Sequence, residues 1–380
     1  MKVPDRVVIL GDNETAVMAA NKLLQRSNRK EIEIIMVGKS NYLEFKDANI
    51  FIPTSLVDHH MLRRSIDSQL NNGVQYINDE VVRLNPKDKS LNTRNGKLIR
   101  YDYLLITNAF NLNNDKIVGF SEEMRTVETI QESLKLRQDV VKIKKGEVVV
   151  YQDKNSLQST VGGVNLSVLL ANYFKEKDLD KDVKVTYVTS NEKLLDNENL
   201  QEKIVSTLEN NGISQVFGFS LSQINVKNRE FTSTDGKTIK YDIPIVIGTS
   251  ELTNFMKEAN FQKSDISPVE VDFKTLSIKG FPEIFITCFG PKFKSSFWEM
   301  NYEQVDFITA KIAHNISGYP EPDSHSGIYM DYLLEAEERA TSFSVDLTGE
   351  YSQGRSSRSD YLLKLYSYHS YFGGYSQGYL

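Results

Sequence analysis

The residues best placed to do chemistry form a six-residue turn near the N-terminus, Gly11-Asp12-Asn13-Glu14-Thr15-Ala16. A short apolar run ends just before this turn, and apolar residues recur at helical spacing after it. Dinucleotide-binding domains place a G-x-G-x-x-G/A turn between strand and helix, where the backbone approaches a pyrophosphate. Gly11 and Ala16 fit this fingerprint, whereas Asn13 stands in place of the second glycine. The ligand-facing half of the motif is therefore altered.

Two acids flank Asn13 and affect whether a phosphate can bind at this turn. Asp12 and Glu14 suit the positive end of a helix dipole, but they compete there with a phosphate. The second strand ends at Val37-Gly38, without the acid that usually holds ribose hydroxyls. One interpretation is an intact cofactor site, and the other is an acid-capped helix in a fold that keeps its architecture. The missing ligand-facing positions favour the second.

The composition excludes several other kinds of chemistry. The chain has 380 residues, of which 40% are hydrophobic and 25% charged, as expected for two globular domains. Its net charge of −6 argues against nucleic acid as a partner. The single cysteine, Cys288, excludes an internal disulfide, and the spacing of the five histidines predicts no metal site. No run reaches the ~18 apolar residues that span a bilayer, so we expect a cytoplasmic protein.

The elements that must position the turn form two similar units. The first has a strand, a helix and a strand at residues 7–10, 16–24 and 32–37, and the second repeats them at 147–151, 164–174 and 182–189. Tyr101-Asp102 and Tyr241-Asp242 each follow a hairpin and precede an apolar strand, which indicates an internal repeat. Gly162-Gly163 is interpreted as the start of a helix rather than an anion site. A further helix is expected at residues 61–71, and a β segment at 75–84.

We therefore predict an α/β fold of two Rossmann-like domains, the second inserted in the first, plus an irregular C-terminal extension. The first domain covers residues 1–112 and 240–318, and the second covers 146–239. Residues 319–349 form a C-terminal segment. Residues 350–380 are a tail rich in tyrosine, serine and glycine, which is not expected to build a core of its own.

This layout resembles the FAD-dependent pyridine nucleotide-disulfide oxidoreductase superfamily, most of all its sulfide:quinone oxidoreductases, with type II NADH dehydrogenases as a neighbouring branch. The resemblance covers about residues 5–320 and implies two FAD/NAD(P)-binding type domains. It also implies that any FAD site, even a vestigial one, consists of Gly11, Asn13, Ala16, Thr107 and Gly290.

The family's functional motifs are incomplete in this chain. Thr107 is followed by Asn108-Ala109 instead of a Thr-Gly-type turn, and Gly290 is followed by Pro291 instead of aspartate. The cysteines that oxidise sulfide in the family align with Val127, with Ser159 or Thr160, and with the neighbourhood of Tyr332. A hydroxyl cannot replace a thiol in persulfide chemistry. These departures favour a protein with no catalytic residues of the family type.

Two hypotheses about function follow from the resemblance. The first is a sulfide:quinone oxidoreductase-like protein that has lost FAD binding and redox catalysis, binds no cofactor, and serves as a structural or protein-binding subunit with a protein partner or as a homo-oligomer. The alternative is an FAD-dependent NAD(P)H or quinone oxidoreductase with relaxed motifs. Flavin in the natively purified protein would discriminate between them.

The tail raises a separate question of location. Members of the resembling family rest on membranes through C-terminal amphipathic segments, and residues 361–366 with the aromatic residues after them could lie at such an interface. The expectation is a cytoplasmic protein, with peripheral contact on the inner face of the cell membrane as an option. A flexible tail, or one that docks on the body or a partner, is the competing interpretation.

Overall fold

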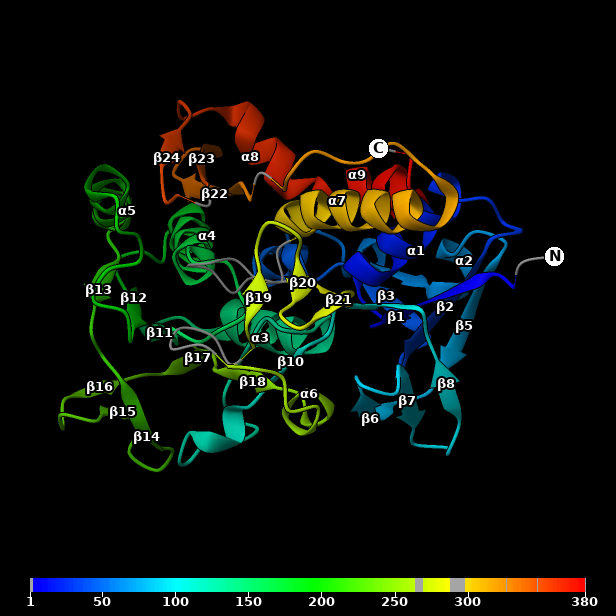
Figure 1. Cartoon of the computed structure of the whole chain (residues 1–380). Coiled ribbons are helices and arrows are strands. Elements are labelled where there is room, and N and C mark those ends of the chain that lie inside the picture. The colour runs from blue at the N-terminus through cyan, green and yellow to red at the C-terminus, as the bar shows by residue number, and fades with distance from the viewer. Residues whose placement is uncertain (1–2, 264–268, 288–297, 326, 347, 380) are drawn as a thin grey trace.

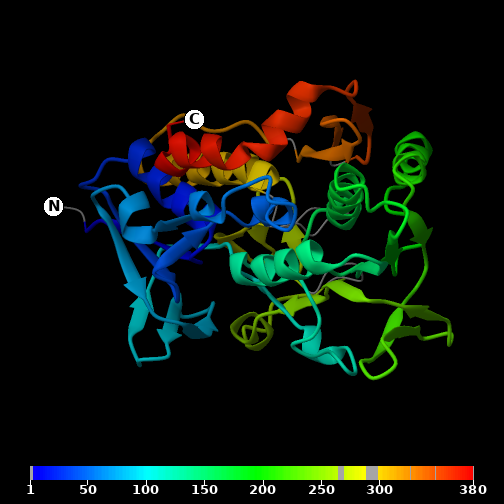
Figure 2. The ribbon, with the colours of Figure 1, turned by 180° about the vertical axis from the view of Figure 1, so that it is seen from behind.

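The computed structural model describes residues 3–263, 269–287, 298–325, 327–346 and 348–379, and only the backbone of residues 298–300. Two α/β units lie side by side, and the C-terminal elements extend along one face of both (Figure 1). Helix α3 (Ile130–Lys142) lies between the units in both views (Figures 1 and 2). The predicted fold class, two Rossmann-like units with the second inserted in the first, is confirmed.

The first unit is built on a seven-stranded sheet of order β19-β20-β21-β9-β1-β2-β5. Five of these strands are parallel, and β19 and β20 add an antiparallel edge. The strands are β1 (Asp5–Leu10), β2 (Ile32–Gly38), β5 (Val74–Asn78), β9 (Tyr103–Ile106), β19 (Val271–Asp272), β20 (Ser277–Ile278) and β21 (Phe281–Ile286). The buried face of α1 (Glu14–Arg26) packs on this sheet, and α7 (Trp298–Ser317) packs along α1.

The second unit has a four-stranded parallel sheet of order β13-β12-β11-β17. Its strands are β11 (Gly146–Gln152), β12 (Val183–Thr189), β13 (Ser214–Val216) and β17 (Ile243–Ile247), with helices α4 (Gly162–Glu176) and α5 (Glu198–Asn210). Because β17 pairs with β11, Tyr241 to Ile247 complete the second unit. The predicted boundary at residues 239/240 is therefore placed too early in the chain.

Each unit also carries a three-stranded antiparallel sheet. In the first it comprises β6 (Val81–Asn85), β7 (Ser90–Thr93) and β8 (Leu98–Arg100), and in the second β14 (Leu221–Asn225), β15 (Glu230–Ser233) and β16 (Thr238–Lys240). The segments that connect the units pair as β10 (Phe110–Leu112) and β18 (Ser250–Leu252), and α6 (Asn254–Glu258) follows.

The region between β2 and β6 differs from the sequence expectation. In place of a helix over residues 61–71, the chain forms η2 (His59–Leu62), strand β4 (Arg63–Ser65) and the short α2 (Ile66–Gln69). Strand β4 pairs with β3 (Tyr42–Glu44), and η1 (Lys46–Phe51) lies between them in the chain. The segment expected over residues 75–84 is two strands, since β5 and β6 belong to different sheets. Tertiary pairing overrides the helical periodicity here.

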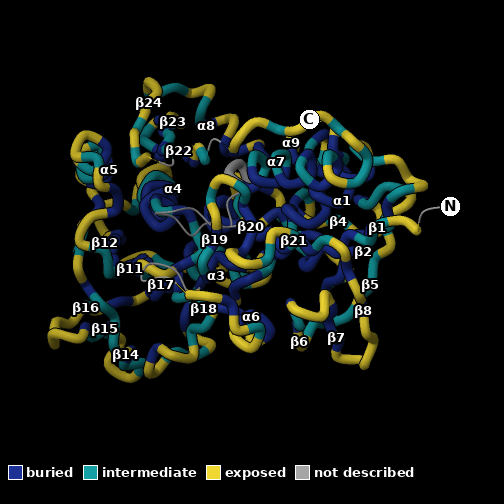
Figure 3. The backbone as a smooth tube through the Cα atoms, viewed as in Figure 1, coloured by how far each residue is buried: buried dark blue, intermediate teal, exposed yellow. Residues whose placement is uncertain are grey.

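The C-terminal residues are regular and join the body. They form β22 (Tyr329–Glu335), β23 (Arg339–Val345), β24 (Tyr351–Gln353), α8 (Arg358–Leu365), α9 (Ser367–Gly373) and η4 (Tyr375–Gln377). The tail builds no separate core, because Tyr371 donates to the Glu14 carbonyl and Asn21 Nδ2 donates to the Ser376 carbonyl. Buried segments gather in the middle of the molecule, around α1 and the sheets, and exposed segments lie at the hairpin ends (Figure 3).

Candidate functional site

A crevice opens at the carboxyl ends of β1, β2 and β9, where parallel α/β sheets bind ligands. It encloses a cavity of about 490 Å³. Its walls come from the turns after these three strands, from the loop before β6, and from α6 and the start of α3. The lining residues used below are Asp12, Asn13, Gly38, Lys46, Thr107, Asn108, Glu128 and Thr253.

The turn after β1 is a tight turn that requires glycine at its first position. Gly11 has φ of 141°, and its amide donates to the Val37 carbonyl at 2.9 Å. A Cβ at this position would lie 2.0 Å from Thr107 Oγ1, so only glycine fits. Ala16 is fully buried against the sheet, as the fingerprint requires.

Asn13 is the N-cap of α1, and its side chain folds back onto the scaffold. Its Oδ1 accepts from the Ala16 amide at 3.0 Å, and its Nδ2 donates to the Thr107 carbonyl at 2.9 Å. The side chain therefore bridges the start of α1 and the turn after β9. Gly11, Asn13, Ala16 and Thr107 do come together at one point, whereas Gly290 lies outside the described residues.

The two acids of the turn also accept hydrogen bonds from backbone amides of the scaffold. Asp12 Oδ2 accepts from the amides of Lys39 and Ser40, at 2.9 and 2.8 Å. Glu14 is buried, and its Oε1 accepts from the Lys46 amide at 2.6 Å. Burial raises the pKa of Glu14 to about 7, opposed by Lys46. Repulsion of a phosphate by these acids is thus weaker than their positions in the sequence suggest.

Three residues of the same crevice carry buried polar atoms. Among the described residues, Asn108 Oδ1, Glu128 Oε1 and Thr253 Oγ1 are buried and make no hydrogen bond. Burial also raises the pKa of Glu128, whose second oxygen accepts from Gln158 at 3.2 Å. Unpaired buried polar atoms are uncommon, but these three have almost no accessible surface and do not face the open part of the crevice. Sequence reasoning named Asn108 but missed Glu128 and Thr253, which lie just before α3 and α6 and follow no apolar strand.

The corresponding turn of the second unit is filled by a side chain. Gln152, the last residue of β11, accepts from the Gly163 amide at 2.8 Å and donates to the Ser159 carbonyl at 2.8 Å. A Cβ on Gly163 would lie 2.7 Å from Gln152 Oε1. Gly162 and Gly163 are the first residues of α4, which agrees with the interpretation of a helix start. A second dinucleotide has no open turn here.

The positions that align with the family's cysteines lie in ordinary packing or in a polar cluster. Val127 is a core residue. Ser159 donates to the fully buried Asp331, which also accepts from Tyr329 at 2.6 Å and lies 3.8 Å from Lys364 Nζ. Cys288, the single thiol of the chain, lies outside the described residues. With a single cysteine, the chain cannot supply a pair of cysteine thiols.

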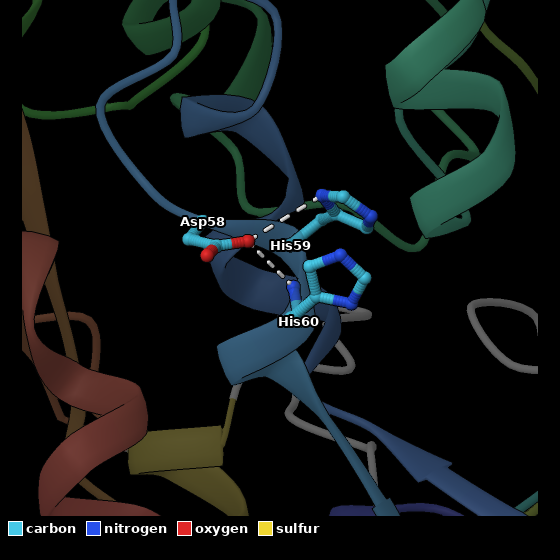
Figure 4. Close-up of side chains that lie close together, drawn as sticks. All are labelled: Asp58, His59 and His60. Atoms are coloured by element: carbon cyan, nitrogen blue, oxygen red, sulfur yellow. Dashed lines mark hydrogen bonds and ion pairs between the residues drawn. The ribbon is translucent and has the colours of Figure 1, made fainter.

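One cluster of metal-type side chains stands at the start of η2 (Figure 4). Asp58 Oδ1 accepts from the His60 amide at 3.0 Å and lies 3.5 Å from His59 Nδ1. The two imidazole rings stack, with centroids 4.0 Å apart and an interplanar angle of 37°. Ring lone pairs lie in the ring planes, so stacked rings do not direct them to one point. The cluster was not foreseen from the sequence.

Across the part of the chain that the structure describes, no helix is both long enough and apolar enough to cross a bilayer.

Comparisons with known proteins agree with the geometry. Residues 5–286 match the family described as pyridine nucleotide-disulphide oxidoreductase. The mitochondrial sulfide:quinone oxidoreductase of Mus musculus is 21% identical over 293 residues, which are 73% of this chain and 64% of that protein. This chain thus aligns with less than two thirds of that relative's length.

Two solved structures have a similar fold. The sulfide:quinone oxidoreductase of Aquifex aeolicus superposes with a TM-score of 0.84 at 14% identity, over 98% of this chain and 92% of that one. A chain in the mitochondrial ATP synthase of Tetrahymena thermophila superposes with a TM-score of 0.79 at 16% identity, over 98% and 94%. The predicted resemblance to sulfide:quinone oxidoreductases is confirmed.

The prediction that the chain binds no cofactor is overturned by the family match, because it places residues 5–286 in a family of FAD-dependent oxidoreductases. The physical argument failed where it judged the turn from residue types. Asn13, Asp12 and Glu14 are each tied to the scaffold, and the crevice beside them stays open. From the fingerprint turn after β1, the two Rossmann-like units and the family match, the chain belongs to the pyridine nucleotide-disulphide oxidoreductase family.

Proposed function

We propose that the protein binds FAD with its adenosine half in the crevice after β1, and that it serves as a flavin-containing subunit of a protein assembly. The observation that carries this proposal is the open cavity of about 490 Å³ beside the turn after β1, where Asn13, Asp12 and Glu14 are each bonded to the scaffold. Gly11 and Thr107 would hold the dinucleotide backbone, and Lys46 supplies a cation to the same cavity. FAD, when bound, supplies hydride and electron chemistry.

Sulfide oxidation is not part of this proposal. The relatives named as sulfide:quinone oxidoreductases are similar in fold, but sulfide chemistry of the family type needs a pair of cysteines and this chain has one. The similarity to a chain within an ATP synthase assembly supports a structural or protein-binding role, since that assembly accommodates the same fold. The partner can be another protein or a second copy of this chain.

The test is an absorbance spectrum of the natively purified protein, with the released cofactor identified after denaturation. We expect about one FAD per chain, and we expect the protein to elute with a larger assembly. Sulfide and NADH should leave the flavin spectrum unchanged. Absence of FAD from the native protein, together with no uptake of added FAD, would contradict the proposal.

A second candidate is an FAD-dependent NAD(P)H or quinone oxidoreductase. The similarity to sulfide:quinone oxidoreductase folds favours a quinone as acceptor. The filled turn of the second unit, with Gln152 bonded to the Gly163 amide, disfavours a nicotinamide donor at that position. Rapid bleaching of the bound flavin by NADH or NADPH, followed by reoxidation with a short-chain quinone, would establish this candidate instead.

Peripheral membrane contact remains a proposal for the tail. Helix α8 exposes Leu362, Leu363 and Tyr366, at 38%, 58% and 46% of their surfaces. Its other side is packed into the body through the buried Tyr361 and Leu365. Leu363→Glu should therefore reduce co-sedimentation with anionic vesicles without lowering stability. Equal co-sedimentation of this variant and the unaltered protein would remove the idea.

A further inference from the structure

The end of β2 has an unusual arrangement. Dinucleotide-binding domains place an acid there to bind the ribose hydroxyls of the adenosine half. This chain has Gly38 at that point, and the next two amides, of Lys39 and Ser40, donate to Asp12 Oδ2 at 2.9 and 2.8 Å. The carboxylate of Asp12 thus lies at the end of β2, although Asp12 belongs to the turn after β1.

Gly38 and Asp12 fit together as a pair. A Cβ on Gly38 would lie 2.5 Å from the Asp12 Cβ, which is closer than real side chains approach. An acid at position 38 and one at position 12 could therefore not both be accommodated. The turn supplies the carboxylate, and the strand end supplies the space for it.

The second oxygen of this carboxylate is available to a ligand. Both hydrogen bonds from Lys39 and Ser40 go to Oδ2, and no described residue donates to Oδ1. Asp12 and Gly38 both line the crevice of about 490 Å³ beside the turn after β1. A carboxylate fixed by two amides and open on one side is a rigid acceptor for paired hydroxyl donors.

We propose that Asp12 binds the ribose 2′,3′-diol of the adenosine half of the dinucleotide, in place of an acid at the end of β2. The assignment rests on the proposed function for the presence of a dinucleotide. It adds which residue of this chain selects a ribose with both hydroxyls. The competing role for Asp12 is that of a clamp that only joins the turn to β2.

The experiment compares ADP with 2′,3′-dideoxy-ADP on flavin-free protein by titration calorimetry. These probes differ only in the hydroxyls, so their affinity ratio isolates the contact. Hydrogen bonds to a charged acceptor predict that the unaltered protein binds ADP about 10- to 100-fold more tightly. Asp12→Asn keeps an oxygen for the Lys39 and Ser40 amides but removes the charged acceptor. The ratio for this variant should fall to about 1- to 3-fold.

Glu198→Gln is the matched control, since Glu198 is an exposed acid in the first turn of helix α5, outside the crevice. This variant should keep the affinity ratio of the unaltered protein. Without ligand, Asp12→Asn should have the melting temperature of the unaltered protein. An Asp12→Asn protein that keeps the full ratio, or an unaltered protein that binds both probes equally, overturns the assignment and leaves FAD binding standing. If the unaltered protein binds neither probe nor FAD, the proposed function fails as well.

Discussion

The two Rossmann-like units share one framework and differ at one turn. Asp102 Oδ2 accepts from the Arg6 amide at 2.7 Å at the start of β1, and Asp242 Oδ2 accepts from the Glu147 amide at 2.8 Å at the start of β11. The backbone amide of Asp102 also donates to the Arg6 carbonyl, and that of Asp242 to the Glu147 carbonyl. The repeated Tyr-Asp pairs of the sequence therefore join the β-hairpin to the first strand in both units.

The turns after the first strands are different. Three residues separate β1 from α1, and Asp12 and Asn13 of this turn line an open crevice. Nine residues separate β11 from α4, and the Gln152 side chain occupies the turn by bonding to Ser159 and Gly163. The comparison teaches that the framework needs only its own backbone contacts, whereas ligand binding depends on whether one turn stays open.

The largest expected effect is at Gly11. Gly11→Ala places a Cβ on Thr107 Oγ1 in a backbone conformation with positive φ, so we expect the free energy of unfolding to fall by about 3 kcal/mol or more. FAD binding should be lost with it. Chemical denaturation and flavin content measure the two effects.

Matched glycine variants give the comparison its control. Gly163→Ala in the second unit also meets a close neighbour, Gln152 Oε1 at 2.7 Å, and should destabilise the protein without loss of FAD. Gly96→Ala has positive φ but open space and should cost only about 1 kcal/mol. Loss of FAD in all three variants would show that the two turns do not differ in function.

The next effect is a pH dependence that comes from Glu14 in the first unit. The pKa of Glu14 is about 7 in the folded protein because of burial, with Asp47 adding to the rise and Lys46 opposing it. Below pH 4.5 the group is protonated in both states. Between pH 4.5 and 7 the unfolded state loses its proton first, so stability falls as pH rises, by about 3 kcal/mol in total. Above pH 7 the loss is complete.

Glu14→Gln should remove this loss, because the amide stays neutral and its Oε1 can still accept from the Lys46 amide. We expect urea unfolding to give similar free energies for variant and unaltered protein at pH 4.5, and a gain of about 1–3 kcal/mol for the variant at pH 8. Glu198→Gln, an exposed acid in the first turn of α5, should change stability by less than about 0.5 kcal/mol. A Glu14→Gln protein with unchanged pH dependence would contradict the prediction.

Gln152→Ala removes the side chain that closes the second turn. It leaves the buried Gly163 amide and Ser159 carbonyl without their partner, so we expect a loss of about 2 kcal/mol in stability. FAD content should not change, and NADH binding should not appear, since residues 153–161 still cover the turn. Gln131→Ala, an exposed change in α3, is the control. Tight binding of NADH to Gln152→Ala would mean that this side chain alone excludes a second dinucleotide.

The smallest effect should be equal in the two units. Asp102→Ala and Asp242→Ala each remove one acceptor from a strand amide, at a cost of about 1 kcal/mol each. Both values should agree within about 0.5 kcal/mol, and the asparagine variants should cost less because they keep an acceptor. Thermal unfolding would reveal a departure from this equality, which would mean that the frameworks are less alike than their geometry indicates.

Prediction from the sequence was most accurate where local pattern decides structure. The β1–α1–β2 unit, its repeat and the Tyr-Asp strands follow from apolar periodicity and from turn residues that lie close together in the chain. The helix expected over residues 61–71 failed because β4 pairs with β3 instead. The tail was not expected to build a core of its own, and docking on the body was one open interpretation; Tyr371 reaches the Glu14 carbonyl across 357 positions of sequence.

The sequence by itself determined the fold, the family and the exclusion of a cysteine pair, because these depend on periodicity and on which atoms the chain contains. Only the tertiary structure decided whether the altered turn is closed. Asn13 folds back onto Thr107, Asp12 reaches the amides after β2, and Gln152 fills the other turn. Each of these side-chain orientations depends on donors and acceptors that distant strands bring together. The residue types at the turn therefore could not reveal them.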